Sequence, residues 1–211
     1  MTNDTEEQEE DIPAGKIPSV VTRLAMTGNR VRTFPPPMAK VAVMVAEEPT
    51  CSFYRYLYNT VGEPWLWYER RQWSDEKLLD WLTDPSVTLY VLYHAGVPAG
   101  FAEIKQSKRY KGIPKDFAGK RIALLAYFGL LPDFIGRGLG TFFLSHVVRT
   151  VWADDLDGMV VDTCNWDHPK AFITYQRAGF EPVAQQRVLV DDPRLDGTLP
   201  PHAGPHIPPT P

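Results

Sequence analysis

A glycine-rich segment is the part of the sequence whose residue types and spacing most directly predict chemistry. Gly136, Gly138 and Gly140 follow the apolar run 122–131, and apolar residues at helical spacing begin at Leu144. Glycine lets backbone amides approach a ligand closely, and the start of a helix offers unpaired N–H groups with a partial positive charge. The segment therefore predicts a phosphate or pyrophosphate site, with a tight turn that binds no ligand as the alternative.

The spacing of these glycines excludes two common nucleotide-binding motifs. A Walker loop needs Gly-Lys-Ser/Thr at its end, and no such triplet follows here. The dinucleotide fingerprint Gly-x-Gly-x-x-Gly also fails, because its third glycine position holds Thr141 when counted from Gly136 and Phe143 when counted from Gly138. A different kind of phosphate site is therefore expected.

The elements that must position this turn are strands and helices in mixed order. Strands are expected where apolar residues alternate or run together, and helices where they recur at helical spacing. The apolar run 122–131 predicts a strand buried on both faces. The expected order is strand 39–46, helix 51–60, a short helix after Ser74, strands 87–93, 99–106 and 122–131, a helix through Val151, strand 158–163, helix 169–178 and strand 180–190.

Two motifs in register on this pattern resemble the GNAT acyltransferase superfamily, over roughly residues 39–190. The family pattern Gln/Arg-x-x-Gly-x-Gly/Ala is matched by Ile135-Gly136-Arg137-Gly138-Leu139-Gly140, with Ile135 in place of the usual Gln or Arg. The family also carries a tyrosine four residues before a Gly-Phe pair, which here is Tyr175 before Gly179-Phe180.

The resemblance implies an α/β fold with a mixed, mostly antiparallel sheet of about six or seven strands, flanked by about four helices. It implies that the fourth and fifth strands, 122–131 and 158–163, splay apart to admit the pantetheine arm of acetyl-CoA. No metal is implied. The residues that the resemblance assigns to acetyl-CoA are Leu130, Ile135, Gly136, Arg137, Gly138, Leu139, Gly140, Thr141, Asn165 and His168.

The resemblance also implies that an amine attacks the thioester directly, which needs a base for the ammonium and an acid for the leaving sulfur. Tyr175 matches the family's usual acid. The stretch 123–127 holds no acidic residue, so Glu103, a carboxylate among apolar neighbours, is the best candidate base. The alternatives are His94, Asp162 and a water chain.

The two ends of the chain differ in composition from the middle. Residues 1–11 carry six acids and no base, and the other 20 acids nearly balance the 22 bases. A near-neutral body does not predict nucleic acid as a partner. Prolines gather early and late. We therefore expect an acidic, then proline-containing tail or arm over 1–37, a GNAT-like domain over 38–190 and a proline-rich tail over 191–211.

Composition also limits the class of protein. A hydrophobic content of 44% and a charged content of 23% are typical of globular chains. No apolar run is long enough to span a bilayer, and the acidic start lacks the layout of a signal peptide. Two cysteines, Cys51 and Cys164, are too few for a disulfide framework or a cysteine-based zinc site. We therefore expect a cytoplasmic protein.

The leading hypothesis is an N-acetyltransferase that uses acetyl-CoA on a primary amine of a small molecule or peptide. The alternatives are a non-catalytic CoA-binding or interaction module on the same fold, and an enzyme for a longer acyl-CoA. A homodimer is one assembly that this protein could form. Aromatic residues that either line an acceptor pocket or pack in the core are Tyr54, Tyr56, Tyr58, Trp65, Trp67, Tyr68 and Trp73, with Glu69, Arg70 and Arg71 beside them.

Overall fold

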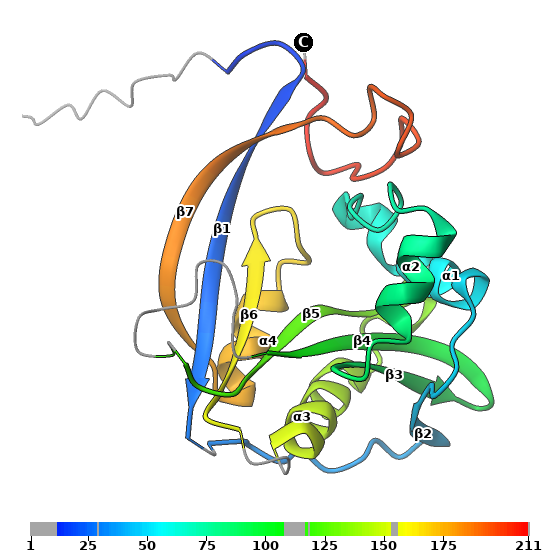
Figure 1. Ribbon diagram of the computed structural model, residues 1–211, viewed down its shortest axis with the longest axis vertical. Coiled ribbons are helices and arrows are strands. Elements are labelled where there is room, and N and C mark those ends of the chain that lie inside the picture. Colours follow the sequence, from blue (N-terminus) through cyan, green and yellow to red (C-terminus); the bar gives the residue numbers. More distant parts are fainter. Residues whose placement is uncertain (1–11, 29, 108–116, 118, 153–155, 211) are drawn as a thin grey trace, which may run out of the picture.

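The computed structural model describes residues 12–28, 30–107, 117, 119–152 and 156–210 (Figure 1). These residues form a seven-stranded sheet in the order β2-β3-β4-β5-β6-β1-β7. Four α-helices and two short 3-10 helices, η1 and η3, flank it, which confirms the expected α/β fold. The bounds are β1 Lys16–Thr27, β2 Val41–Val45, α1 Cys51–Gly62, η1 Glu63–Trp65, α2 Asp75–Leu82, β3 Val87–His94, β4 Val97–Ser107, β5 Ile122–Leu130, η3 Pro132–Phe134, α3 Leu139–Trp152, β6 Gly158–Cys164, α4 Ala171–Ala178 and β7 Glu181–Asp191.

The strands β5 and β6 are the parallel pair in this otherwise antiparallel sheet, and they separate early. Their register runs from Ile122 opposite Gly158 to Leu125 opposite Val161 and then ends. Beyond that point β5 continues beside β4, where Leu130 lies opposite Gly100. The splay expected between the strands 122–131 and 158–163 is therefore confirmed, and it opens a gap inside the sheet.

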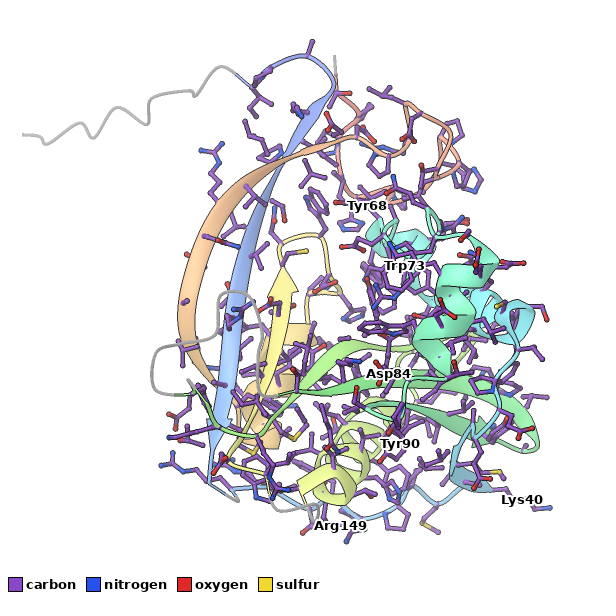
Figure 2. All side chains as sticks on the ribbon, viewed as in Figure 1. Lys40, Tyr68, Trp73, Asp84, Tyr90 and Arg149 are labelled. Carbon is purple, nitrogen blue, oxygen red and sulfur yellow. The ribbon has the colours of Figure 1, made fainter. Side chains whose placement is uncertain are left out.

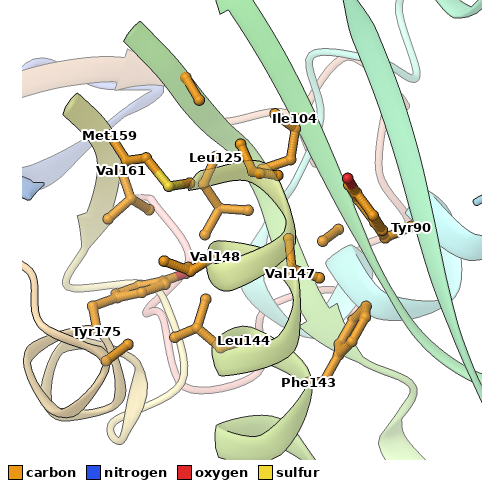
Figure 3. Close-up of a cluster of buried hydrophobic side chains, with 14 of the residues drawn as sticks. Tyr90, Ile104, Leu125, Phe143, Leu144, Val147, Val148, Met159, Val161 and Tyr175 are labelled. Atoms are coloured by element: carbon orange, nitrogen blue, oxygen red, sulfur yellow. The ribbon is translucent and has the colours of Figure 1, made fainter. Parts of the chain in front are cut away.

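Two hydrophobic clusters cover the two faces of the sheet. On β3, Leu89 and Val91 pack with α1 and α2, whereas Tyr90 and Leu92 pack with α3 and α4. This alternation follows from the two-residue period of a strand. Figure 3 shows Leu144, Val147 and Val148 of α3 pointing toward the sheet, on the face that α3 and α4 cover. Figure 2 shows that side chains fill both faces. In the described part of the chain, no helix has the length and apolar character to cross a membrane.

Local signals fix the helix ends, including the start after Ser74 that the sequence predicts. Ser74 accepts a hydrogen bond from the backbone N–H of Lys77 at 3.2 Å and begins α2. Thr50 does the same for Phe53 at the start of α1. Gly179 ends α4 with φ of 114°, a left-handed conformation that glycine adopts without steric cost.

The segment expected as an N-terminal tail or arm contains a strand of the sheet. β1 lies between β6 and β7 and pairs with both, from Val21 opposite Cys164 and from Lys16 opposite Asp191. Pro18 suggested an extended arm, but it sits where β1 has β7 as its neighbour before the pairing with β6 begins. A proline without an N–H donor is tolerated at such a position. The globular unit therefore starts well before residue 38.

The proline-rich C-terminal segment also packs on the domain. Leu199, Ala203 and Ile207 are buried in a cluster with Leu66 and Trp166. The carboxylate of Asp192 binds Arg194 at 2.7 Å, and Arg194 donates further hydrogen bonds to the carbonyls of Ala203, Ile207 and Pro208. Because one guanidinium satisfies several carbonyls, this segment is ordered without helix or strand, which its composition did not indicate.

The position of β1 in the sheet makes it essential for stability. Leu24 is fully buried on β1, so Leu24→Ala should lower the free energy of unfolding by about 2–5 kcal/mol, as for other buried leucines. Leu189→Ala on β7 is the matched control, because Leu189 is 47% exposed and should change stability by less than about 0.5 kcal/mol. Urea unfolding measures both, and equal effects would contradict the buried position of β1.

Candidate active site

A cavity of about 770 Å³ lies where β5 and β6 separate. Residues 124–130 of β5 and 161–164 of β6 form its sides. The glycine turn, α4 and the segment 65–70 after α1 also line it, and further lining residues come from β1, β7 and the loop after β6. The fold therefore brings the glycine motif, the tyrosine motif and part of the aromatic segment to one space.

The glycine turn has two kinds of glycine. Gly136 and Gly138 have φ of 82° and 74°, which is the left-handed region that favours glycine. Gly140 lies in the first turn of α3, where a Cβ would meet Leu130 Cδ1 at 3.6 Å, an ordinary contact. The first N–H groups of an α-helix have no intrahelical partner. The cavity-lining residues of the predicted coenzyme site are Leu130, Ile135, Gly136, Gly138, Leu139, Gly140, Thr141 and His168.

Two predicted coenzyme contacts lie outside this lining. The side-chain oxygen of Asn165 accepts a hydrogen bond from the backbone N–H of Val20 at 2.7 Å, so it faces β1. The guanidinium of Arg137 lies 5.1 Å from the centre of the Phe134 ring. Contacts of these two residues with a coenzyme stay predictions.

Tyr175 reaches the cavity from α4. The residue is 6% exposed and packs edge-on against Phe128 and Phe180. Burial, and secondarily the nearby carboxylate of Asp167, raises the pKa of Tyr175 well above its ordinary value. The hydroxyl therefore keeps its proton at neutral pH, which is the state that an acid in catalysis requires.

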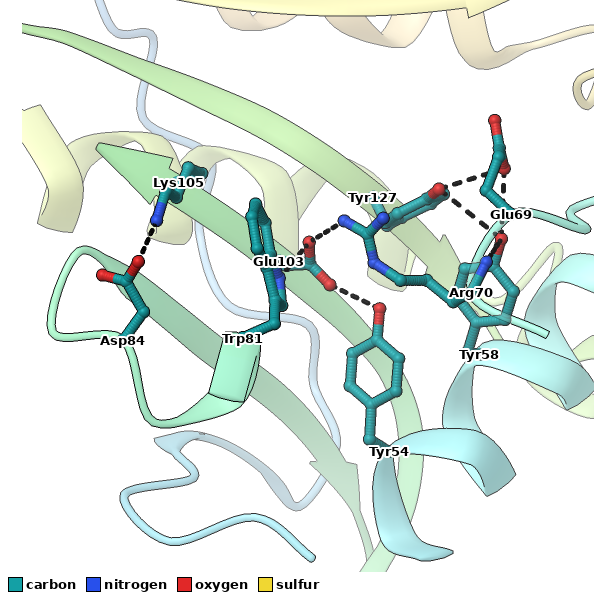
Figure 4. Close-up of polar contacts among 9 residues, drawn as sticks. All are labelled: Tyr54, Tyr58, Glu69, Arg70, Trp81, Asp84, Glu103, Lys105 and Tyr127. Atoms are coloured by element: carbon teal, nitrogen blue, oxygen red, sulfur yellow. Dashed lines mark hydrogen bonds and ion pairs between the residues drawn. The ribbon is translucent and has the colours of Figure 1, made fainter. Parts of the chain in front are cut away.

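Glu103 is enclosed in a polar cluster rather than exposed on its strand (Figure 4). Its side chain has no exposed area and lies outside the cavity lining. The carboxylate accepts hydrogen bonds from the Tyr54 hydroxyl, from Trp81 Nε1 at 3.0 Å and from Arg70 Nη2 at 2.8 Å. An amine in the cavity therefore has no surface of Glu103 to contact directly, and its role as proton acceptor stays a prediction.

The alternative bases are placed differently. Asp162 lines the cavity but is ion-paired with Arg23 at 2.6 Å. His94 lies at the end of β3 beside the Phe134 ring and outside the cavity lining. Both residues are candidate bases from the sequence, but no sequence pattern indicates that Arg23 and Phe134 are their neighbours.

Arg70 links the buried cluster to the cavity. Its guanidinium carbon lies 3.9 Å from the ring centre of Trp73, 4.8 Å from Trp81 and 5.0 Å from Tyr127. Such stacking and the Glu103 ion pair together hold the arginine in place. The sequence signal that could have predicted this arginine is Glu103 itself, because an isolated carboxylate in the apolar run 99–104 needs a buried basic partner.

Glu69 precedes Arg70 and faces the cavity. One carboxylate oxygen, Oε2, accepts hydrogen bonds from Tyr127 at 3.0 Å and Tyr58 at 3.2 Å. Burial and then the Glu69 charge raise the pKa of both phenols, so both remain hydrogen-bond donors. The sequence placed Glu69 in the segment beside the acceptor but gave it no role.

A sheet that splits beside a glycine turn and a helix N-terminus defines an N-acetyltransferase type of fold. The chain belongs to the acetyltransferase (GNAT) family, whose model matches residues 44–180.

Solved structures share this fold at low sequence identity. A functionally unknown conserved protein from Staphylococcus epidermidis has a TM-score of 0.57 at 14% identity, over 84% of this chain and 64% of its own. A GCN5-related N-acetyltransferase from Kribbella flavida has a TM-score of 0.55 at 17% identity, over 85% and 60%. This chain thus spans less than two thirds of these two proteins.

A third structure is the aminoglycoside N-acetyltransferase AAC(6')-Iy in complex with CoA. It has a TM-score of 0.50 at 20% identity, over 74% of this chain and 95% of its own. Among proteins with curated descriptions, none matches this chain in sequence.

The geometry of the turn makes Gly140→Val a selective probe of coenzyme binding, because the family pattern has glycine or alanine at this position. Valine is no worse than glycine in a helix, and a Cβ here would make an ordinary contact, so the variant should fold. Its branched side chain would stand in the lining and weaken acetyl-CoA binding by about tenfold or more, measured by calorimetry. Thr150→Ala, at the exposed far end of α3, should leave the affinity unchanged. Wild-type affinity in Gly140→Val would place the coenzyme elsewhere.

The burial of Glu103 predicts a large effect on stability. Glu103→Gln would leave the Arg70 guanidinium buried without a carboxylate, which typically costs about 3–5 kcal/mol. Asp75→Asn is the matched control, since Asp75 pairs with Arg55 but is 77% exposed, and surface pairs contribute about 0–1 kcal/mol. Chemical denaturation measures both. A Glu103→Gln variant as stable as the control would show that the ion pair does not hold this region.

Proposed function

We propose that this protein is an N-acetyltransferase that transfers the acetyl group of acetyl-CoA to a primary amine of a small molecule or peptide. The observation that carries the proposal is the shared lining of one cavity by the glycine turn and Tyr175. The first provides a binding site for pyrophosphate, and the second provides an acid for a leaving thiolate. Family membership supports the same reading.

Coenzyme binding would use both walls of the gap. The N–H groups of Gly138, Gly140 and Thr141 at the start of α3 would bind the pyrophosphate, with the positive end of the helix dipole behind them. The pantetheine arm would lie between β5 and β6, beside backbone groups of β5 that have no partner strand on that side beyond Leu125. An aminoglycoside N-acetyltransferase of similar fold was solved in complex with CoA, which supports CoA as the coenzyme.

The reaction would proceed by direct attack. The amine nitrogen forms a bond to the thioester carbonyl carbon, and the tetrahedral intermediate then breaks its C–S bond. Tyr175 gives its proton to the leaving sulfur and regains one from the nitrogen. The other proton of the original ammonium passes to solvent, so the products are the amide, the CoA thiol and one proton.

The Tyr175 hydroxyl provides the test of this mechanism. Tyr175→Phe removes the hydroxyl alone, so packing and acetyl-CoA affinity should persist while turnover falls by roughly 10²–10⁴, the usual effect of a positioned acid or base. Release of free thiol measures turnover. Tyr56→Phe, which alters a 49% exposed tyrosine on α1, should retain full activity.

Two outcomes would point away from the proposal. Unchanged turnover in Tyr175→Phe, with chemistry shown to limit the rate, would remove Tyr175 as the acid. A protein that binds CoA, but transfers neither an acetyl group nor a longer acyl group to any amine, would instead be a non-catalytic CoA-binding module.

A further inference from the structure

We propose that Glu69 binds the ammonium group of the acceptor, and that the acceptor is a primary monoamine with a flat apolar body. The inference rests on the proposed function and names the acceptor class for the same cavity. It comes from the charges and rings of the lining around Glu69.

The Glu69 carboxylate is held in an orientation that leaves one oxygen available. Oε2 accepts from the hydroxyls of Tyr127 and Tyr58. Figure 4 shows the other oxygen pointing away from both phenols, and within the described residues it has no hydrogen-bond partner. The residue is exposed and lines the cavity. A fixed carboxylate with a free oxygen is suited to a charge-assisted hydrogen bond from an ammonium group.

The neighbouring charges leave Glu69 uncompensated. The guanidinium of Arg70 is engaged by Glu103 at 2.8 Å, and its side chain is 11% exposed. The Glu103 carboxylate therefore balances the charge of Arg70, and the Glu69 carboxylate faces the cavity without a cationic partner among the described residues. The backbone N–H of Arg70 also donates to the Tyr58 hydroxyl at 3.3 Å, so the buried cluster fixes the chain at Glu69.

The other acids of the described lining are already engaged. Asp162 forms an ion pair with Arg23. Asp167 accepts hydrogen bonds from the Thr163 hydroxyl at 2.7 Å and the Cys164 N–H at 3.0 Å, and burial raises the pKa of Asp167. The lining therefore has one strong place for one cation.

The walls beside Glu69 are aromatic. Tyr127 donates a hydrogen bond to Glu69, Trp67 lies 5.0 Å from the Tyr127 ring centre, and Tyr68 precedes Glu69 in the chain; all three line the cavity. Ring faces bind flat apolar groups and favour a cation next to them. A polycation such as an aminoglycoside would bring its remaining ammonium groups into a lining that holds Arg70, Lys170 and Arg177, and whose other carboxylates are already engaged. The chemistry thus favours an arylalkylamine over a polyamine.

Steady-state kinetics with 2-phenylethylamine and kanamycin test the proposal. The wild type should use 2-phenylethylamine with a kcat/KM at least about tenfold higher than that for kanamycin. Glu69→Gln removes a charged hydrogen bond worth about 1.5–3 kcal/mol, so the KM for 2-phenylethylamine should rise about 10–100-fold while acetyl-CoA affinity stays unchanged. Glu76→Gln, on an exposed position of α2, should match the wild type.

Calorimetry of 2-phenylethylamine binding to the CoA-loaded and free protein separates this proposal from the proposed function. Binding that Glu69→Gln abolishes, without any acetyl transfer, would support the amine site and overturn the enzyme. Turnover with an unchanged KM in a folded Glu69→Gln variant would overturn the amine site and leave the enzyme standing. A preference for kanamycin, or no binding of 2-phenylethylamine in either state, would overturn the proposed acceptor class.

Discussion

The separation of β5 from β6 after Leu125 is the constraint on which the rest of the structure depends. Two adjacent strands normally gain hydrogen bonds by continuing side by side, so each must find other partners to stay apart. β4 pairs with β5 as far as Leu130, and β1 pairs with β6 as far as Cys164. Each wall of the gap is therefore fixed by its outer neighbour. The cavity follows from this arrangement, and the glycine turn lies at its edge because only the short helix η3 separates it from the end of β5.

A second constraint acts at the other end of the cavity, through the ion pair between Arg70 and Glu103. Burying two charges carries a large desolvation cost, so such a pair contributes little net stability but is costly to break. Its effect here is positional. The pair and the surrounding rings tie the segment after α1 to β4, which places Glu69 beside Tyr127. The two ends of the cavity thus differ in chemistry, with backbone amides at one end and a carboxylate with aromatic rings at the other.

Much of this could be predicted from the sequence, for physical reasons that also explain the failures. Local patterns predicted the helix start at Ser74 and the glycine turn, because caps and left-handed glycines act within a few residues. The place of β1 in the sheet was missed, since pairing depends on partners more than a hundred residues away. The packing of the C-terminal segment was missed because Arg194 organises it through carbonyls that composition does not reveal. Glu103 was recognised as unusual, but its enclosure depends on Tyr54 of α1, Trp81 of α2 and Arg70 from the segment between these helices.

The central claim is that the gap between β5 and β6 is the acyl-CoA site. A crystal structure of the full chain with bound CoA tests it most directly. We expect the pyrophosphate oxygens at about 2.7–3.2 Å from backbone nitrogens of residues 138–141, the usual hydrogen-bond range, with the pantetheine arm between the two strands and the sulfur next to Tyr175. CoA bound at another surface, or a gap that is closed by continued pairing of β5 with β6, would contradict the account.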